Sequence, residues 1–272
     1  MSSNEFGHDT YLSPFTWRYG SDEMRHVWSE IHKRRTWRRL WVSLAKAQLH
    51  VGLVSEAQIE DLQGKVDAVD IDQAHAIEAD IKHDLMAEVK TYASQCPIGG
   101  GIIHLGATSM DIEDNADVMR MAQALSLLQT KLCKLIESVC VLADRWADRA
   151  TMAFTHLQPA EPTTIGYRVA QLLWDLMCDL EDLERVRSQL MGKGFKGATG
   201  TSASYAQLLK GTELSPAQLE RMVLEPFDIE PMPVATQTYA RKQDFRILST
   251  LASLAQSLSK FASDLRLLQS PP

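Results

Sequence analysis

One polar segment, residues 154–164, carries a histidine that could act in proton transfer. His156 stands there among few apolar side chains and shortly before Pro159, so its ring is not expected to fill a core. Histidine titrates near neutral pH and can act as a general acid or base. We therefore take His156 as a candidate acid–base residue; a structural histidine is the alternative.

A second polar segment, residues 106–117, combines hydroxyls, backbone amides and carboxylates. Thr108 and Ser109 follow Gly106 and could bind a carboxylate, although the same pair could equally cap a helix. The segment also holds four acidic residues: Asp111, Glu113, Asp114 and Asp117. They suggest a metal cluster, but favourable charge near a helix N-terminus explains them better, and we expect no obligatory metal.

Two weaker pairs could also take part in chemistry. His83 and Asp84 adjoin on a predicted helix, where a plain solvated polar pair is the better interpretation of the residues alone. Arg18 and Tyr19, in the loop at residues 13–21, offer a guanidinium fork and a hydroxyl that suit a phosphate.

Two further stretches invite a functional interpretation. The basic run at residues 32–39 suggests nucleic-acid binding, but it falls on an amphipathic helix in a chain of net charge -7. We expect a solvated face with salt-bridge partners, and no nucleic-acid partner. The stretch at 191–204 is rich in glycine and hydroxyls and predicts a loop whose backbone amides could hold an anion.

Composition limits the class of protein. The chain has 272 residues and 45% hydrophobic content, which is ample for a packed core. Its four cysteines lack metal or redox spacing and are expected to be reduced core thiols. No secretory leader and no apolar run of about 20 residues is evident, so we expect a cytoplasmic protein without a membrane partner.

The elements that must position these residues are predicted to be mainly helices, because apolar residues recur at helical spacing along most of the chain. This spacing predicts an amphipathic helix at 36–51, a short helix from Ser55 to 64 behind a capping box, and one or two helices over 72–92. The glycines between 99 and 108 predict irregular backbone. Strand alternation is nearly absent, so the fold class is predicted to be all-α.

Three long stretches carry apolar residues at alternating spacings of three and four, at 118–146, 169–183 and 248–265. Such spacing is typical of long rods in a helix bundle. The two polar segments at 106–117 and 154–164 lie at the ends of the first rod. Because small residues are mixed into the apolar faces, we expect the rods to pack against other subunits in an oligomer.

Taken in order, several motifs resemble the adenylosuccinate lyase family of the fumarase/aspartase superfamily. The resemblance runs from about residue 13 to 268 and rests on Trp-Arg-Tyr-Gly-Ser21, His83-Asp84-Leu-Met-Ala87, Gly106–Asp117, Phe154-Thr-His-Leu-Gln-Pro159, Lys196-Gly-Ala-Thr-Gly-Thr201 and Thr236-Gln-Thr-Tyr-Ala-Arg-Lys242. It implies a helical N-terminal domain at 1–107 and part of a central long-helix bundle at 108–272. It also implies a cytoplasmic homotetramer without cofactor, acting on an adenylosuccinate-like nucleotide in purine synthesis.

The resemblance implies cleavage of a C–N bond, with adenylosuccinate giving AMP and fumarate, and the analogous succinyl-carboxamide ribotide step. His156 matches the general acid, and His83 a position near it and the phosphate. The matching substrate-binding positions are Arg18, Tyr19, Asp84, Thr108, Ser109, Thr155, Thr201 and Gln237. Arg18 and Tyr19 would meet the phosphate, while Thr108, Ser109 and Gln237 would hold the succinyl carboxylates.

Three departures from the family pattern stand out. Ser202 and Lys82 replace a glutamine and an arginine of many relatives, which are mild changes. The loop Ser-Ser-x-Met-Pro-x-Lys-x-Asn-Pro, which carries the presumed base in the family, does not follow the third rod here. We therefore expect a partial lyase with little activity alone; a non-catalytic oligomerisation or regulatory fragment, and a sister fumarate-releasing lyase, are the alternatives.

Overall fold

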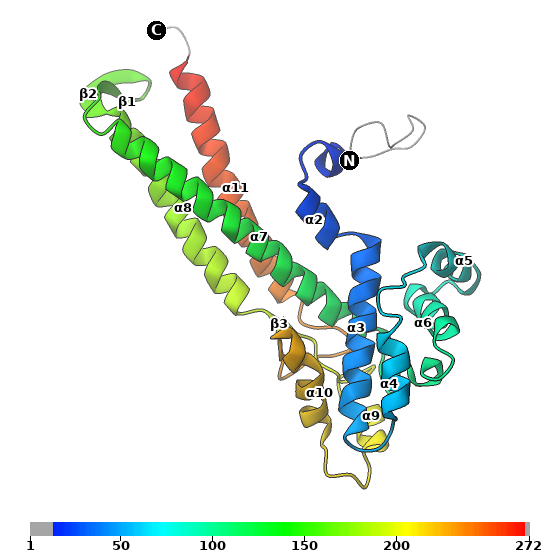
Figure 1. Ribbon diagram of the computed structural model, residues 1–272. Coiled ribbons are helices and arrows are strands. Elements are labelled where there is room, and N and C mark those ends of the chain that lie inside the picture. Colours follow the sequence, from blue (N-terminus) through cyan, green and yellow to red (C-terminus); the bar gives the residue numbers. More distant parts are fainter. Residues whose placement is uncertain (1–12, 270–272) are drawn as a thin grey trace. The chain divides into compact units, whose positions relative to one another are not determined.

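The computed structural model describes residues 13–269 (Figure 1), of which the side chains of Pro14 and Trp17 are excluded. The chain forms two compact units. Unit 1 joins the residues up to Ala124 with Leu190–Ala240, and unit 2 joins Leu125–Gln189 with the residues from Arg241 onward. The boundary expected between residues 107 and 108 remains a prediction.

Unit 1 is built from short and medium helices. They are α1 (Pro14–Trp17), α2 (Asp22–Val27), α3 (Glu30–Leu49), α4 (Glu56–Gln63), α5 (Ile71–Ile81), α6 (Asp84–Gln95), the 3₁₀ turns η2 (Gly100–Ile102) and η3 (Glu225–Phe227), α9 (Ala203–Leu208) and α10 (Pro216–Leu224). Strands β3 (Met191–Gly192) and β4 (Glu230–Pro231) pair in parallel. The first part of α7 (Ser109–Arg145) also belongs to unit 1.

The core of unit 1 forms around α3. Its apolar side chains, including Trp41 and Leu44, pack with residues of α4, α6, α7 and α10 in one cluster. The expected capping box is confirmed, since the Ser55 hydroxyl accepts from the Gln58 backbone N–H while the Gln58 side chain returns to the Ser55 N–H. The predicted helical region at 72–92 consists of two helices, which separate where Lys82 adopts a left-handed backbone.

Unit 2 consists of long rods, as the heptad spacing predicts. The second part of α7, α8 (Ile165–Ser188) and α11 (Lys242–Leu268) run beside one another (Figure 1). Gly166 starts α8 so close to the end of α7 that an added Cβ would collide with the backbone around Ala143 and Ala147. All-α architecture is confirmed for the bulk of the chain, with two small two-stranded sheets added.

A β-hairpin is the main element that the periodicity missed. Strands β1 (Ala150–Thr155) and β2 (Gln158–Thr164) pair antiparallel between α7 and α8, with Thr155 opposite Gln158. The two residues of the turn, His156 and Leu157, both have positive φ, 54° and 59°. Positive φ at both central positions matches the twist of tight hairpins, although here no glycine supplies it.

Two expectations about side chains are wrong. The basic run has the salt-bridge partners that were expected, but Arg34 and Arg38 are buried rather than solvated, because both pair with buried Glu88 of α6 at 3.0 and 2.7 Å. Of the cysteines, only Cys96 is buried; Cys140 and Cys178 are exposed on α7 and α8. None of the described helices is both long and apolar enough to span a membrane.

Candidate active site

His83 lies at the start of α6 as its N-cap. Its Nδ1 accepts from the Met86 backbone N–H at 3.4 Å, and its Nε2 lies 3.4 Å from the hydroxyl of Ser109. The Asp84 carboxylate is 3.8 Å from Nδ1. The imidazole is partly exposed, so this pair of helix starts presents a titratable ring and a hydroxyl toward solvent.

Thr108 and Ser109 lie where α7 begins. The Thr108 backbone N–H donates to the carboxylate of Asp111 at 3.1 Å, and the Thr108 carbonyl accepts from the Asp111 N–H at 3.0 Å. This is a capping arrangement, and it holds both hydroxyls at the positive end of the helix dipole. The Thr108 N–H is therefore already bonded to a protein carboxylate, and carboxylate binding by the two hydroxyls stays a prediction.

Asp111 is fully buried and joins this turn to the glycine-rich loop. Its carboxylate accepts from the Lys193 ammonium, from the backbone N–H groups of Lys196 and Gly197 at 3.1 and 3.2 Å, and from the Tyr205 hydroxyl at 3.2 Å. Burial, together with this carboxylate, raises the pKa of Tyr205 well above its usual value. Asp111 is thus a structural anion rather than free charge at a helix terminus.

The glycine-rich loop uses its amides internally, which corrects the expectation of free anion-binding groups. The Phe195 N–H donates to Glu220 at 3.1 Å, and the Gly194 N–H to Asn115 at 3.1 Å. The Lys196 ammonium also pairs with Glu220, at 2.7 Å. Charge in this loop is therefore neutralised by protein carboxylates.

The far end of the loop reaches the polar segment at residues 106–117. The Ser204 hydroxyl donates to the Gly106 carbonyl at 2.8 Å, and Leu208 lies where a side chain at Gly106 would project. Gly106 has φ of 79°, so both its conformation and its packing require glycine. Thr201 is exposed in this loop, with its hydroxyl 3.2 Å from that of Thr199.

His104 is a site residue that the sequence did not single out. Its Nδ1 accepts from the Trp41 indole N–H at 3.1 Å, and burial lowers its pKa to about 4 against the opposing charge of Asp111. The charge of His83 lowers it further. A neutral ring that accepts at Nδ1 carries its proton on Nε2, ready to donate to a ligand. Its only sequence signal is its place two residues before Gly106.

Glu113, one turn into α7, is perturbed in the opposite sense. Burial raises its pKa to about 7, and the nearby negative charge of Asp84 adds to the effect. Burial also raises the pKa of Asp117. Among the described residues no group of three or more His, Cys, Asp or Glu side chains could hold a metal ion.

Three other predicted residues of unit 1 have exposed side chains. Arg18 and Tyr19 are exposed, with the guanidinium 6.0 Å from the centre of the Tyr19 ring. Gln237 is exposed in the turn before Tyr239, whose backbone N–H donates to Asp114 at 2.9 Å. Asp114 therefore ties the Gln237 segment to α7.

Thr155 and His156 belong to unit 2, at the tip of the hairpin, and both are exposed. The left-handed backbone at His156 and Leu157 costs free energy, and strain of this kind gathers at functional sites. The expectation that the His156 ring does not fill a core is confirmed.

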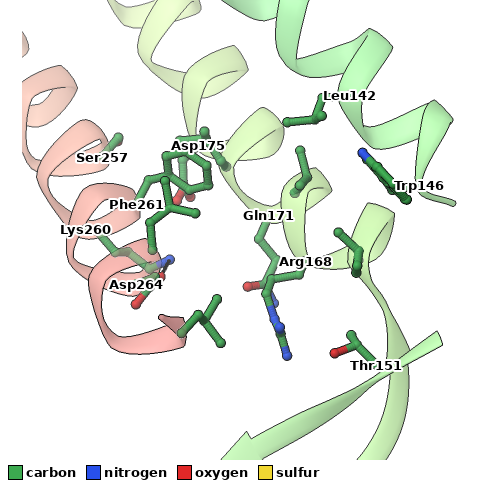
Figure 2. A pocket seen from close by; sticks show the side chains of 15 residues that line it. Leu142, Trp146, Thr151, Arg168, Gln171, Asp175, Ser257, Lys260, Phe261 and Asp264 are labelled. Carbon is green, nitrogen blue, oxygen red and sulfur yellow. Dashed lines mark hydrogen bonds and ion pairs between the residues drawn. The ribbon is translucent and has the colours of Figure 1, made fainter. Parts of the chain in front are cut away.

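A separate cavity of about 320 Å³ lies within unit 2. Figure 2 shows side chains from α7, α8 and α11 converging on it, with Trp146, Leu142 and Phe261 among its apolar walls. None of the ten predicted site residues lines it, so its chemistry differs from that of the candidate site.

Known proteins are similar to this chain over nearly all of its length. A model of the lyase family matches residues 18–272. Adenylosuccinate lyase of Saccharomyces cerevisiae is 38% identical over 266 residues, which cover 96% of this chain but 55% of the yeast protein. Adenylosuccinate lyase of Pyrococcus abyssi is 31% identical, and the match covers 95% of this chain and 56% of the Pyrococcus protein. The chain thus spans about half the length of these relatives.

Solved structures share the fold. Fumarate lyase from Mesorhizobium sp. BNC1 superposes with a TM-score of 0.83 at 23% identity, covering 93% of this chain and 58% of that one. The 3-carboxy-cis,cis-muconate lactonizing enzyme from Pseudomonas putida gives 0.83 at 25% identity, with 94% and 58% covered. By the family match and by the motifs that carry it, this chain belongs to the lyase family and is related to adenylosuccinate lyases.

Proposed function

We propose that this chain carries the substrate-binding and acid side of an adenylosuccinate-type C–N lyase. The reaction would convert adenylosuccinate to AMP and fumarate, and would also cleave succinyl-carboxamide ribotide. The observation that carries the proposal is the contact of His83 with Ser109, where two helix starts present a titratable ring beside a carboxylate-sized cradle. Neutral His104 supports it, because a ring proton on Nε2 suits an anionic ligand.

The elimination needs two proton transfers. A base removes the proton from the carbon beside one succinyl carboxylate, and the carbon–nitrogen electron pair leaves with the nitrogen as the double bond of fumarate forms. An acid protonates the departing nitrogen, the role proposed for His156. Negative charge accumulates on the carboxylate, where the Thr108 and Ser109 hydroxyls and the α7 amides would stabilise it. The 272 residues do not contain the family's base loop.

The remaining residues receive binding roles by the same proposal. Arg18 and Tyr19 would contact the phosphate, Gln237 would orient the succinyl group, and Asp84 would contact the substrate beside His83. Thr155 and Thr201 are weaker candidates because both side chains are exposed, and the Thr201 hydroxyl bonds with that of Thr199.

Complementation tests the proposal. The chain would be assayed for loss of adenylosuccinate absorbance alone, and then mixed with full-length yeast adenylosuccinate lyase whose histidine at the position of His156 is replaced by glutamine. The yeast chain would then supply the base-bearing loop, and this chain would supply the acid. We expect no turnover from either partner alone and measurable turnover from the mixture. His156→Gln should abolish the turnover of the mixture, whereas Glu161→Gln, an exposed change on the same hairpin, should not.

Calorimetry with AMP and with fumarate provides the second readout. Binding without complementation would favour a non-catalytic regulatory fragment. Absence of both binding and complementation would overturn the proposal. Turnover of another fumarate adduct in place of adenylosuccinate would point to a sister lyase.

We also propose that unit 2 packs against further copies, as a tetramer by family resemblance. The support is an exposed apolar surface that includes Trp174, Tyr167 and Leu248. Trp174→Glu should lower the mass measured by light scattering at equal concentration, because it places a charge on that surface. An unchanged mass would contradict this use of the surface.

A further inference from the structure

The basic run on α3 contains one cation that the fold leaves without a carboxylate. Lys33 pairs with Glu30 at 2.8 Å and Arg35 with Asp67 at 2.7 Å, while Arg34 and Arg38 share Glu88. Among the described residues no carboxylate lies within salt-bridge distance of Arg39.

A hollow of about 320 Å³ lies beside Arg39 in unit 1. It is lined by Arg39, Val42, Ser43, Lys46, Gln63, Val66, Pro226 and Phe227. Lys46 follows Arg39 by seven residues, which is two helical turns or about 10 Å, so both project from the same side of α3. Within the described part of the chain Lys46 also has no carboxylate partner, so two exposed cations border one hollow.

Between the cations the wall is apolar. Val42 is buried, while Val66, Phe227 and the ring of Pro226 contribute further hydrocarbon. The Ser43 hydroxyl is already used, since it donates to the Val223 carbonyl at 2.7 Å. The volume falls at the lower end of the range of small-molecule sites, about 300–1,000 Å³.

We infer that this hollow binds a small organic anion with an apolar body and one carboxylate or phosphate group. The anionic group would lie between Arg39 and Lys46, and the body would cover Val42, Val66 and Phe227. A neutral ligand would leave both cations unpaired, and an inorganic anion would leave the apolar wall in water. The hollow shares no residue with the candidate active site, so the inference does not rest on the proposed function.

Titration calorimetry on the 272-residue chain tests this with four probes: naphthoate, naphthyl phosphate, naphthamide and inorganic phosphate. At least one aromatic anion should bind about tenfold more tightly than both naphthamide and inorganic phosphate. The comparison of the two aromatic anions identifies the preferred anionic group. Methyl NMR of valine-labelled protein should show the largest shifts at Val42 and Val66.

Substitutions locate the site. Arg39→Gln and Lys46→Gln should each weaken binding about three- to fivefold, the size expected for a partly exposed ion pair. Lys210→Gln, an exposed cation outside the hollow, should leave affinity unchanged. An unchanged thermal midpoint shows that each variant is folded. Equal binding of naphthamide, no effect of either substitution, shifts confined to unit 2, or no binding of any probe would overturn the inference.

Discussion

Unit 1 and unit 2 bury polar and apolar groups in opposite ways. Unit 1 holds the main apolar cluster together with buried charges that are paired, as Asp111 is with Lys193. Unit 2 leaves large apolar side chains such as Trp174 and Leu248 exposed at 67% and 64%. Its buried acid, Asp179, accepts only from Ser253 at 2.9 Å, and its second oxygen has no partner among the described residues.

The difference follows from helix length and connection. Short helices that cross in several directions enclose a core on all sides, whereas long parallel rods contact each other along narrow stripes. Three rods cannot cover the apolar stripes that each of them carries. Unit 1 therefore encloses its apolar core and pairs its buried charges, while unit 2 presents an apolar surface that further helices would cover.

The largest expected change in stability, and so the strongest test of this contrast, is that of Asp111→Asn. The substitution leaves Lys193 buried without a counter-charge, which typically costs about 3–5 kcal/mol of the free energy of unfolding. Urea unfolding followed by near-UV circular dichroism would measure it. Adding Lys193→Met to Asp111→Asn should recover part of the loss; a loss below about 1 kcal/mol for the single variant would contradict the paired-charge description.

A matched pair of leucines tests the apolar half of the comparison. Leu44→Ala in unit 1 creates a cavity at a side chain that is 1% exposed, and should cost about 2–5 kcal/mol. Leu248→Ala in unit 2 removes an exposed side chain, and should change monomer stability by less than about 0.5 kcal/mol. Both would be measured by urea unfolding at low concentration. Equal losses would show that the rods are already covered.

The pH dependence of unit 1 should have two opposing contributions. The pKa of His104 falls to about 4 on folding, so the unfolded chain binds the proton more tightly and stability decreases as pH drops from about 6.5 toward 4. The pKa of Glu113 rises to about 7, so the folded chain binds the proton more tightly and stability decreases as pH rises from about 4.5 toward 7.

Single variants separate the two contributions. His104→Gln should remove the loss of stability that occurs as pH falls toward 4. Glu113→Gln should remove the loss of stability that occurs as pH rises toward 7. Each loss is expected to be on the order of 1–2 kcal/mol in thermal unfolding across this pH range. His75→Gln, an exposed histidine of α5, is the control for His104. A pH profile that His104→Gln leaves unchanged would argue against a buried neutral ring.

Among the substitutions of buried charged groups, the smallest effect is expected for Asp179→Asn. Because only one oxygen is bonded, the amide keeps the Ser253 contact and removes a buried charge, so unfolding should change by less than about 1 kcal/mol. Chemical denaturation beside Asp111→Asn gives a direct comparison of two buried aspartates. A loss as large as that of Asp111→Asn would mean that Asp179 has a cationic partner in the folded protein.

The sequence predicted those features of the fold that depend only on residues close together along the chain. The three rods and the Ser55 capping box require only neighbours within a few residues, and all are present. The hairpin was missed because Pro159 and Pro162 interrupt strand alternation, and because its turn lacks the usual glycine. Arg34 was expected in solvent because its partner Glu88 lies 54 residues away in sequence.

The candidate site likewise has features that the sequence determined and features that only the tertiary structure decided. By itself the sequence determined which residue types are present, in which order, and hence the family: Thr108 with Ser109, the His83–Asp84 pair and His156. The tertiary structure alone decided that His83 meets Ser109, that Asp111 holds the glycine-rich loop, and that the half-buried His104 ring accepts from Trp41. The reason is physical, because helix spacing is a local property of the chain, whereas burial and pairing depend on segments that only folding brings together.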